Sequence, residues 1–326
     1  MKKNLQKNVV VIGGGTGSFV LLSGLKHYPV NLTAIVPVTD DGGSTGRLRD
    51  EFGFLPVGDM RQCLAALAPD NSLLRQLLTY RFSKGQGLKG HNLGNLILTA
   101  LEDMLGSEPE AISKAAKIFR LQGQVLPISD KLVKLKATYS NNQSITSEHK
   151  IETNRLNRGQ KITNLTTQPQ AQINAKAAQA IKHADIIILA PGDLFNSLIA
   201  NLVILGTTKA INNSKAKIAY VVNLMTLNSQ TDQFSAKNHL DTLESYLTKP
   251  VDHVIINSQP ISSKIIKLYQ KLDEYPVKDD LINDPRVIRK PLLASSTYQK
   301  SQTDSLKRSL LRHDPQKLAK VIVGLI

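Results

Sequence analysis

A glycine cluster near the start of the chain has the composition of a phosphate-binding turn. Its members are Gly13, Gly14, Gly15, Thr16 and Gly17. Glycines let the backbone approach a phosphate, and a helix that starts there offers free N–H groups and a positive dipole. The cluster lacks the Gly-Lys-Ser/Thr of a Walker loop, and Ser18 replaces the third glycine of a dinucleotide fingerprint. Such turns can be purely structural, but their glycine density favours a nucleotide or another phosphorylated ligand.

A second polar segment carries carboxylates, a hydroxyl and guanidinium groups after the next apolar run. Asp40 and Asp41 could hold a Mg²⁺ ion bound to a diphosphate, or one of them could act as a general base. Arg47 and Arg49 could clamp phosphate oxygens, and Ser44 lies between the two pairs. The alternative is turn chemistry, in which the aspartates bind their own backbone. The segment alone leaves both interpretations open.

Four further polar groups fall at predicted helix starts or strand ends. They are Asp59 with Arg61, His91 with Asn92 and Asn95, Gly192 with Asp193, and Asn223 with Thr226. We interpret Asp59 as the N-cap of an apolar helix. A lone histidine is more often structural than catalytic, but the two asparagines beside His91 favour a role in the site. Gly192 follows another strand, so two phosphate-type turns would share one sheet.

Short β-branched runs alternate with helical stretches along most of the chain. The predicted strands are Asn8–Ile12, Leu32–Val38, Ile186–Ala190, Ile218–Val222 and Val254–Asn257. This order predicts an α/β, Rossmann-like fold with a mostly parallel, doubly wound sheet in one domain over residues 1–326. Parallel strands end at one edge, so the polar segments should meet there. Residues 124–172 alternate differently and predict a small β-rich insertion with a basic face rather than a long loop.

Composition narrows the classes of partner. The 326 residues carry 41 Lys plus Arg against 26 Asp plus Glu, a formal charge of +15, which suits an anionic partner. Aromatic residues are only 5% and Trp is absent, so we do not expect nucleic acid. No apolar run approaches the ~18 residues of a membrane span, and we expect a cytoplasmic protein. We expect no zinc site, and Cys63 to be a core residue.

Considered together, the motifs resemble those of the CofD-like family, whose members are similar to 2-phospho-L-lactate transferase. Within this family they resemble the branch of the YvcK-type gluconeogenesis factors. The resemblance covers the chain almost end to end. It rests on Gly13-Gly14-Gly15-Thr16-Gly17, Asp40-Asp41-Gly42-Gly43-Ser44-Thr45-Gly46-Arg47-Leu48-Arg49, Gly58-Asp59-Met60-Arg61, His91-Asn92-Leu93-Gly94-Asn95, Pro191-Gly192-Asp193-Leu194 and Asn223-Leu224-Met225-Thr226.

The resemblance implies a nucleotide-bearing ligand and two functions. In the YvcK-type branch the ligands are UDP-sugars and the role is in cell shape and envelope synthesis on gluconeogenic carbon sources, with no established reaction. In the transferase branch a nucleotide-activated phospholactyl group is joined to the hydroxyl of a deazaflavin, and the reaction requires Mg²⁺. This branch implies that Asp40 and Asp41 are the candidate catalytic or metal-binding residues. We expect the first function and keep the second as the alternative, ahead of an NAD-dependent dehydrogenase. No other cofactor is implied. The sequence is compatible with a homo-oligomer and does not indicate protein partners.

Two departures from the family pattern bear on the ligand. Asp193 stands where the family usually has a serine, so a carboxylate would face a phosphate unless it turns away to cap the helix. Asn238-His239 replaces the usual Asp-His. Neither change touches the expected fold.

Overall fold

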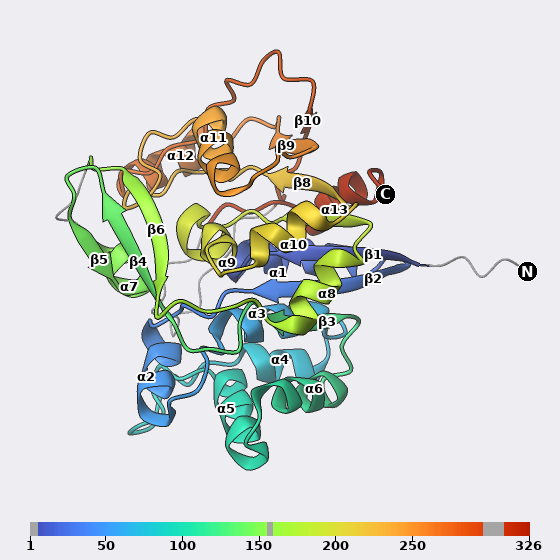
Figure 1. The fold of residues 1–326 in the computed structure, drawn as a ribbon, viewed down its shortest axis with the longest axis vertical. Helices are drawn as coiled ribbons and strands as arrows, with labels where there is room; N and C mark the ends of the chain where they lie inside the picture. The colour runs from blue at the N-terminus through green and yellow to red at the C-terminus, as the bar shows by residue number, and fades with distance from the viewer. Residues whose placement is uncertain (1–5, 155–158, 296–309) are drawn as a thin grey trace, which may run out of the picture.

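A seven-stranded parallel sheet forms the centre of the protein (Figure 1). The computed structural model describes residues 6–154, 159–295 and 310–326. The strand order is β10-β9-β8-β7-β1-β2-β3, and every neighbouring pair is parallel. The strands are β1 (Lys7–Ile12), β2 (Val30–Val36), β3 (Gln124–Pro127), β7 (Ile186–Leu189), β8 (Lys217–Val221), β9 (His253–Asn257) and β10 (Val287–Lys290). The chain order reverses between β1 and β7, which confirms the predicted doubly wound α/β fold.

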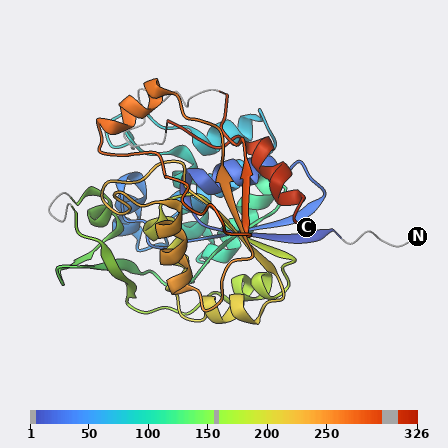
Figure 2. The ribbon, with the colours of Figure 1, turned by 90° about the horizontal axis from the view of Figure 1, so that it is seen from above.

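Alternating side chains of the strands bury two separate apolar cores, one on each face of the sheet. Val9 and Val11 of β1 belong to one core, and Val10 and Ile12 to the other, because successive side chains of a strand point to opposite faces. The first face carries α1 (Gly15–Leu25), α3 (Gly58–Leu67) and α13 (Pro315–Val323). The second carries α8 (Ala175–Lys182), α10 (Thr207–Asn213) and α11 (Ala236–Tyr246). Figure 2 shows both helical layers from above.

The remaining helices extend this frame. In Figure 1, α4, α5 and α6 continue from α3 at the bottom, beside α2. Their bounds are Gly43–Phe52 for α2, Leu73–Thr79 for α4, Leu93–Leu105 for α5 and Glu108–Ile118 for α6. The segment after β7 forms a π-helix, η1 (Leu194–Ile199), followed by α9 (Ala200–Leu202), and α12 (Ser263–Gln270) follows β9. The helix α2 occupies the segment in which the sequence indicated only a polar turn.

The predicted insertion is a three-stranded antiparallel sheet of order β5-β4-β6. It contains β4 (Lys134–Tyr139), β5 (Ser144–Thr146), α7 (Glu148–Thr153) and β6 (Ile162–Gln168). Leu135, Ala137 and Tyr139 of β4 join the core of the second face, so the insertion packs on the main domain. It is shorter than residues 124–172, because β3 pairs with β2 in the main sheet. Figure 1 shows it at the left, away from the start of β1.

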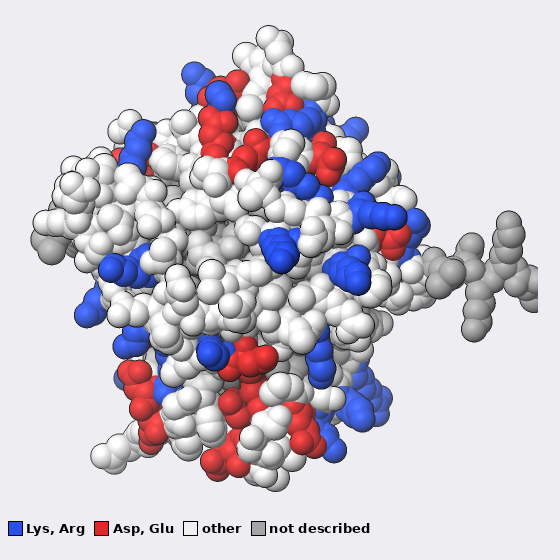
Figure 3. All heavy atoms as spheres, in the orientation of Figure 1, with Lys and Arg blue, Asp and Glu red and all other residues white. Residues whose placement is uncertain are grey.

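The surface charge is dispersed over the face that Figure 3 shows. Lys and Arg are scattered across it, and Asp and Glu form one group near the bottom, where α5 and α6 lie, and another near the top, around α11. A net charge of +15 therefore does not produce one continuous basic patch on this face. None of the helices in the described ranges combines the length and apolar character that crossing a membrane requires.

Candidate functional site

The glycine turn after β1 brings helix α1 into contact with the turn after β7. Gly14 is the N-cap of α1 and, as a glycine, offers no side-chain cap of its own. Gly13 and Gly15 have positive φ angles of 151° and 62°, which favour glycine. A Cβ on Gly17 would lie 1.4 Å from the carbonyl oxygen of Pro191, so only glycine fits at this position. The two predicted turns therefore meet between β1 and β7, where open α/β sheets bind ligands.

Asp59 closes one side of the first turn. Its Oδ1 accepts a hydrogen bond from the backbone N–H of Gly15 at 2.9 Å, and a Cβ on Gly14 would lie 1.9 Å from its Oδ2. The expected N-cap role is wrong: Val57 occupies the N-cap of α3, without a side-chain cap. Burial raises the pKa of Asp59 to about 7, nearby Asp40 and Asp193 add to the rise, and the Gly15 hydrogen bond opposes it.

Asp40 and Asp41 are held by their own turn and by the insertion. Oδ1 of Asp40 accepts from the N–H of Gly42 at 2.9 Å, so the alternative of turn chemistry is confirmed for Asp40. Oδ1 of Asp41 accepts from the N–H of His149, in α7, at 2.8 Å. Burial raises the pKa of Asp40, and Asp41 adds to it. A Cβ on Gly58 would lie 2.5 Å from Oδ2 of Asp40, which brings Asp40 to the start of α3, next to Asp59.

Glu148 is a site residue that sequence reasoning missed. Its Oε2 accepts a hydrogen bond from the hydroxyl of Thr39 at 2.5 Å. Burial raises its pKa well above the ordinary value for glutamate, and the charges of Asp40 and Asp59 raise it further. Glu148 begins α7 within a polar stretch of the insertion, where no local pattern distinguishes it. Asp40, Asp59 and Glu148 form the group that we call the carboxyl cluster.

A buried polar network joins the start of α2 to the start of α5. Oγ of Ser44 lies 3.2 Å from Nδ1 of His91 and accepts from Nδ2 of Asn95 at 3.4 Å. Asn92 caps α5, because its Oδ1 accepts from the N–H of Asn95 at 3.3 Å. Burial lowers the pKa of His91, and Arg47 lowers it further. The predicted residues are thus brought together, and their contacts link the two helices.

The three arginines of the predicted site differ in their surroundings. Arg49 is buried and donates to the carbonyls of Thr39 at 3.3 Å, Asp40 at 3.2 Å and Val133 at 2.8 Å. Arg61 is buried as well and donates to the carbonyl of Leu78 at 3.2 Å. Arg47 is exposed beside Gly90 and has neither a hydrogen bond nor an ion pair with any residue of the described ranges. Of the three, Arg47 is available to an incoming anion.

Asn223 holds the glycine turn after β7. Its Oδ1 accepts from the N–H of Gly192 at 3.2 Å, and its Nδ2 donates to the carbonyl of Gly192 at 2.5 Å. Both backbone groups of Gly192 are therefore bound by one side chain. Thr226 lies apart from this contact, because it is buried and exchanges hydrogen bonds with Tyr275.

The structure shows where the two departures from the family pattern, Asp193 and Asn238-His239, lie. Asp193 is the N-cap of η1, but its side chain makes no capping hydrogen bond, and its charge contributes to the raised pKa of Asp59. Asn238 forms a capping box with Ser235 at the start of α11. His239 is fully buried next to Phe234.

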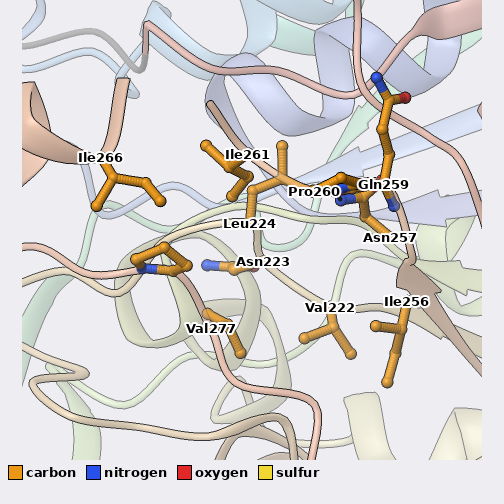
Figure 4. Close-up of a pocket in the computed structure, with 11 residues that line it drawn as sticks. Val222, Asn223, Leu224, Ile256, Asn257, Gln259, Pro260, Ile261, Ile266 and Val277 are labelled. Atoms are coloured by element: carbon orange, nitrogen blue, oxygen red, sulfur yellow. Dashed lines mark hydrogen bonds between the residues drawn. The ribbon is translucent and has the colours of Figure 1, made fainter. Parts of the chain in front are cut away.

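A cavity of about 220 Å³ opens beyond Asn223, at the ends of β8 and β9. Figure 4 shows Asn223, Asn257 and Gln259 among mostly apolar side chains. Its other walls are Val222, Leu224, Ile256, Pro260, Ile261, Ile266, Pro276 and Val277. Sequence reasoning identified only Asn223 of this set, because the walls come from separate segments that follow β8, that end β9 and begin α12, and that lie around Pro276. Apolar walls with a few amides suit the flat ring of a base or another planar group.

The described parts of the chain contain no group of three or more His, Cys, Asp or Glu arranged to hold a metal ion by themselves. Mg²⁺ usually takes only one or two carboxylates together with substrate phosphates; Asp40 and Asp41 are two such carboxylates, and one oxygen of each already accepts a backbone hydrogen bond. The thiol of Cys63 is buried in the core, as expected, and burial raises its pKa.

Comparisons with known proteins agree with this architecture. The family model for 2-phospho-L-lactate transferase CofD matches residues 9–293. A protein named gluconeogenesis factor from Halalkalibacterium halodurans is 37% identical over 99% of this chain and 97% of its own length. The gluconeogenesis factor of Bacillus subtilis is 35% identical over 98% of each chain. A crystal structure of a UPF0052 family member from Bacillus halodurans superimposes with a TM-score of 0.88 at 35% identity and covers 98% of this chain and 99% of its own.

Proposed function

The chain belongs to the CofD family, and from that premise we propose that it is a nucleotide-sugar-binding regulatory protein of the gluconeogenesis-factor type. Its ligand in this proposal is a UDP-sugar, and its role lies in cell shape and envelope synthesis on gluconeogenic carbon sources. The relatives named gluconeogenesis factor, which match it over nearly their whole length, support this assignment. A cytoplasmic location is part of the proposal.

The meeting of two glycine turns at the β1/β7 switch point carries the proposal. The approach of Gly17 to Pro191 puts the N-terminus of α1 beside the turn that Asn223 holds. A helix N-terminus attracts a diphosphate through its dipole and its free N–H groups, and at α1 these are the first-turn N–H groups after that of Gly15, which Asp59 binds. The exposed Arg47 supplies a cation for the same ligand.

The carboxyl cluster supports a hydroxyl-rich ligand rather than a bare nucleotide diphosphate. Carboxylates repel phosphates but accept hydrogen bonds from ribose or sugar hydroxyls. Asp59 accepts a hydrogen bond from Gly15 in the first turn, and Asp40 lies next to Asp59 at the start of α3, where a Cβ on Gly58 would be 2.5 Å from its Oδ2. A UDP-sugar joins a diphosphate to the hydroxyl groups of a sugar, which matches a phosphate-type turn with carboxyl groups beside it.

Thermal denaturation with several ligands tests the proposal. UDP-N-acetylglucosamine, GDP, NAD and a deazaflavin would each be added with and without Mg²⁺. A ligand of the native state stabilises it by about 2.7 kcal/mol at a hundredfold excess over Kd. We expect UDP-N-acetylglucosamine to raise the melting temperature most. A shift with NAD alone would show that the proposal is wrong.

A second candidate is a Mg²⁺-dependent transferase of the phospholactyl type. Burial raises the pKa of Asp40 and raises that of Asp59 to about 7, and these shifts favour it because burial makes a carboxylate a stronger general base. Asp40 or Asp41 would take the proton of the acceptor hydroxyl or bind a metal ion that neutralises the diphosphate. The hydroxyl oxygen would then bond to the phosphorus of the phospholactyl group, while the bond from that phosphorus to the nucleotide breaks and a nucleoside monophosphate leaves. Mass spectrometry of a mixture with nucleotide-activated phospholactate, a deazaflavin and Mg²⁺ tests it, since only the transferase forms a joined product.

A further inference from the structure

The insertion is fastened to the loop after β2 by hydrogen bonds at its base. The hydroxyl of Thr39 donates to Glu148, the N–H of His149 donates to Asp41, and Arg49 donates to the carbonyl of Val133. The partners of the first bond are separated by 109 positions in the chain. The insertion therefore brings a carboxyl group to the candidate site that the Rossmann-like part does not supply.

The position of Glu148 is electrostatically unfavourable without a partner. It stands with Asp40 and Asp59 in the carboxyl cluster, and these two charges act on it directly. Like charges at close range destabilise the fully ionised cluster. A cation, or hydroxyl groups that donate hydrogen bonds, would relieve this repulsion, whereas a phosphate would increase it.

The layout of the site favours hydroxyls at this end. The sheet order sets β2 and its loop, with Glu148, on one side of the switch point and the ends of β8 and β9 on the other. The glycine turns at the centre suit the diphosphate, and the mostly apolar cavity by Asn223 suits a base. A nucleotide sugar laid across the switch point in this direction directs its sugar toward the carboxyl cluster.

We propose that Glu148 contacts the ligand and accepts a hydrogen bond from a hydroxyl of the sugar; this inference rests on the proposed function. The contact makes the site selective for a nucleotide sugar over the nucleotide alone. The insertion is then the part of the molecule that senses the sugar. Glu148 docks on Thr39 with one oxygen, Oε2, and its other oxygen is the acceptor in this proposal.

Isothermal titration calorimetry with UDP-N-acetylglucosamine and with UDP tests this role. For Glu148→Ala we expect the Kd of UDP-N-acetylglucosamine to rise about tenfold, as for the loss of one hydrogen bond, and the Kd of UDP to change less than about twofold. Glu148→Gln still accepts a hydrogen bond and should lie between wild type and Glu148→Ala. Glu152→Gln removes an exposed carboxylate of the same helix and is the matched control, expected to bind like wild type.

The outcomes separate this inference from the proposed function. Parallel loss of both ligands in Glu148→Ala would mean that Glu148 only docks the insertion, and unchanged affinities would mean that it does not contact the sugar. Either result overturns the inference and leaves the proposed function standing. Wild-type protein that binds neither UDP nor UDP-N-acetylglucosamine would overturn both. Circular dichroism of each variant verifies that it is folded.

Discussion

The glycine turn after β1 and the glycine turn after β7 look alike in sequence and are held in different ways. In the first turn the N–H of Gly15 is bound by Asp59, a carboxyl group with a pKa raised to about 7. In the second, Asn223 binds both the N–H and the carbonyl of Gly192. The first turn is therefore sensitive to protonation and charge, whereas a neutral amide fixes the second.

This difference assigns distinct tasks to the two turns. A turn clamped on both backbone groups is a rigid support, since neither group can rotate without losing a bond. A turn closed by a titratable carboxyl can change its electrostatic character when a cation or a hydroxyl-bearing ligand arrives. Under the proposed function, Gly192 and Asn223 would position the ligand, and the first turn, with Asp59, would respond to its charge.

The contact between the two turns should be the most sensitive point of the comparison. In Gly17→Ala the new methyl group would overlap the carbonyl oxygen of Pro191 at 1.4 Å, so α1 and the second turn must separate. We expect a loss of about 3 kcal/mol or more in the free energy of unfolding, measured in urea. Gly53→Ala is the control, because nothing lies within 4 Å of its Cβ, and its positive φ should cost only about 1 kcal/mol. Equal losses would contradict the close approach.

Loss of the Asn223 hydrogen bonds to the second turn should have the next largest effect on stability. Asn223→Ala leaves the N–H and the carbonyl of Gly192 without their partner, which should lower the free energy of unfolding by about 2 kcal/mol. The loss should be the same at pH 5 and pH 8, because an amide does not titrate. Asn228, which donates to an exposed carbonyl at 3.2 Å, is the control, and Asn228→Ala should cost less than about 0.5 kcal/mol. A pH-dependent loss in Asn223→Ala would remove the contrast between the turns.

Asp59→Asn tests the charge of the first turn. Because the folded-state pKa of Asp59 is about 7 against an ordinary 3.8, its stabilising contribution is present below about pH 4 and is lost as the pH rises to 7. The variant keeps an acceptor for Gly15 and has no such loss. Between pH 5 and 7 its stability relative to wild type should improve by about 1.4 kcal/mol or more. Urea unfolding at several pH values measures this, and parallel curves would refute it.

The comparison also shows which features a sequence can predict. Strands β1, β2, β7, β8 and β9 were predictable because buried parallel strands are continuous apolar runs. β10 was missed, since its short run ends in Arg289 and Lys290. The helix α2 was missed because Gly43–Phe52 has few apolar residues and thus no apolar stripe.

The site was predictable where strand order alone brings residues together. Gly13 to Gly17 and Gly192 follow strands that are neighbours in the sheet, so their meeting follows from the fold. The role of Asp59 was misassigned because its partner, Gly15, is 44 positions away and a local capping pattern explained it equally well. Glu148 depends on how the insertion docks, which is a tertiary contact without a local signature.

Arg47 should have the smallest effect on stability and a clear effect on binding. The first turn faces carboxyl groups, so neutralising charge for a diphosphate has to come from outside the turn, and Arg47 is exposed without an ion-pair partner among the described residues. Arg47→Ala should change the free energy of unfolding by less than about 0.5 kcal/mol and raise the Kd of UDP-N-acetylglucosamine about tenfold in calorimetry. Lys114→Ala makes the same charge change at an exposed position of α6 and should bind normally. Unchanged affinity in Arg47→Ala would mean that the polar residues from Asp40 onward only form a turn and the start of a helix. Binding of the diphosphate would then depend on the N-terminus of α1 alone.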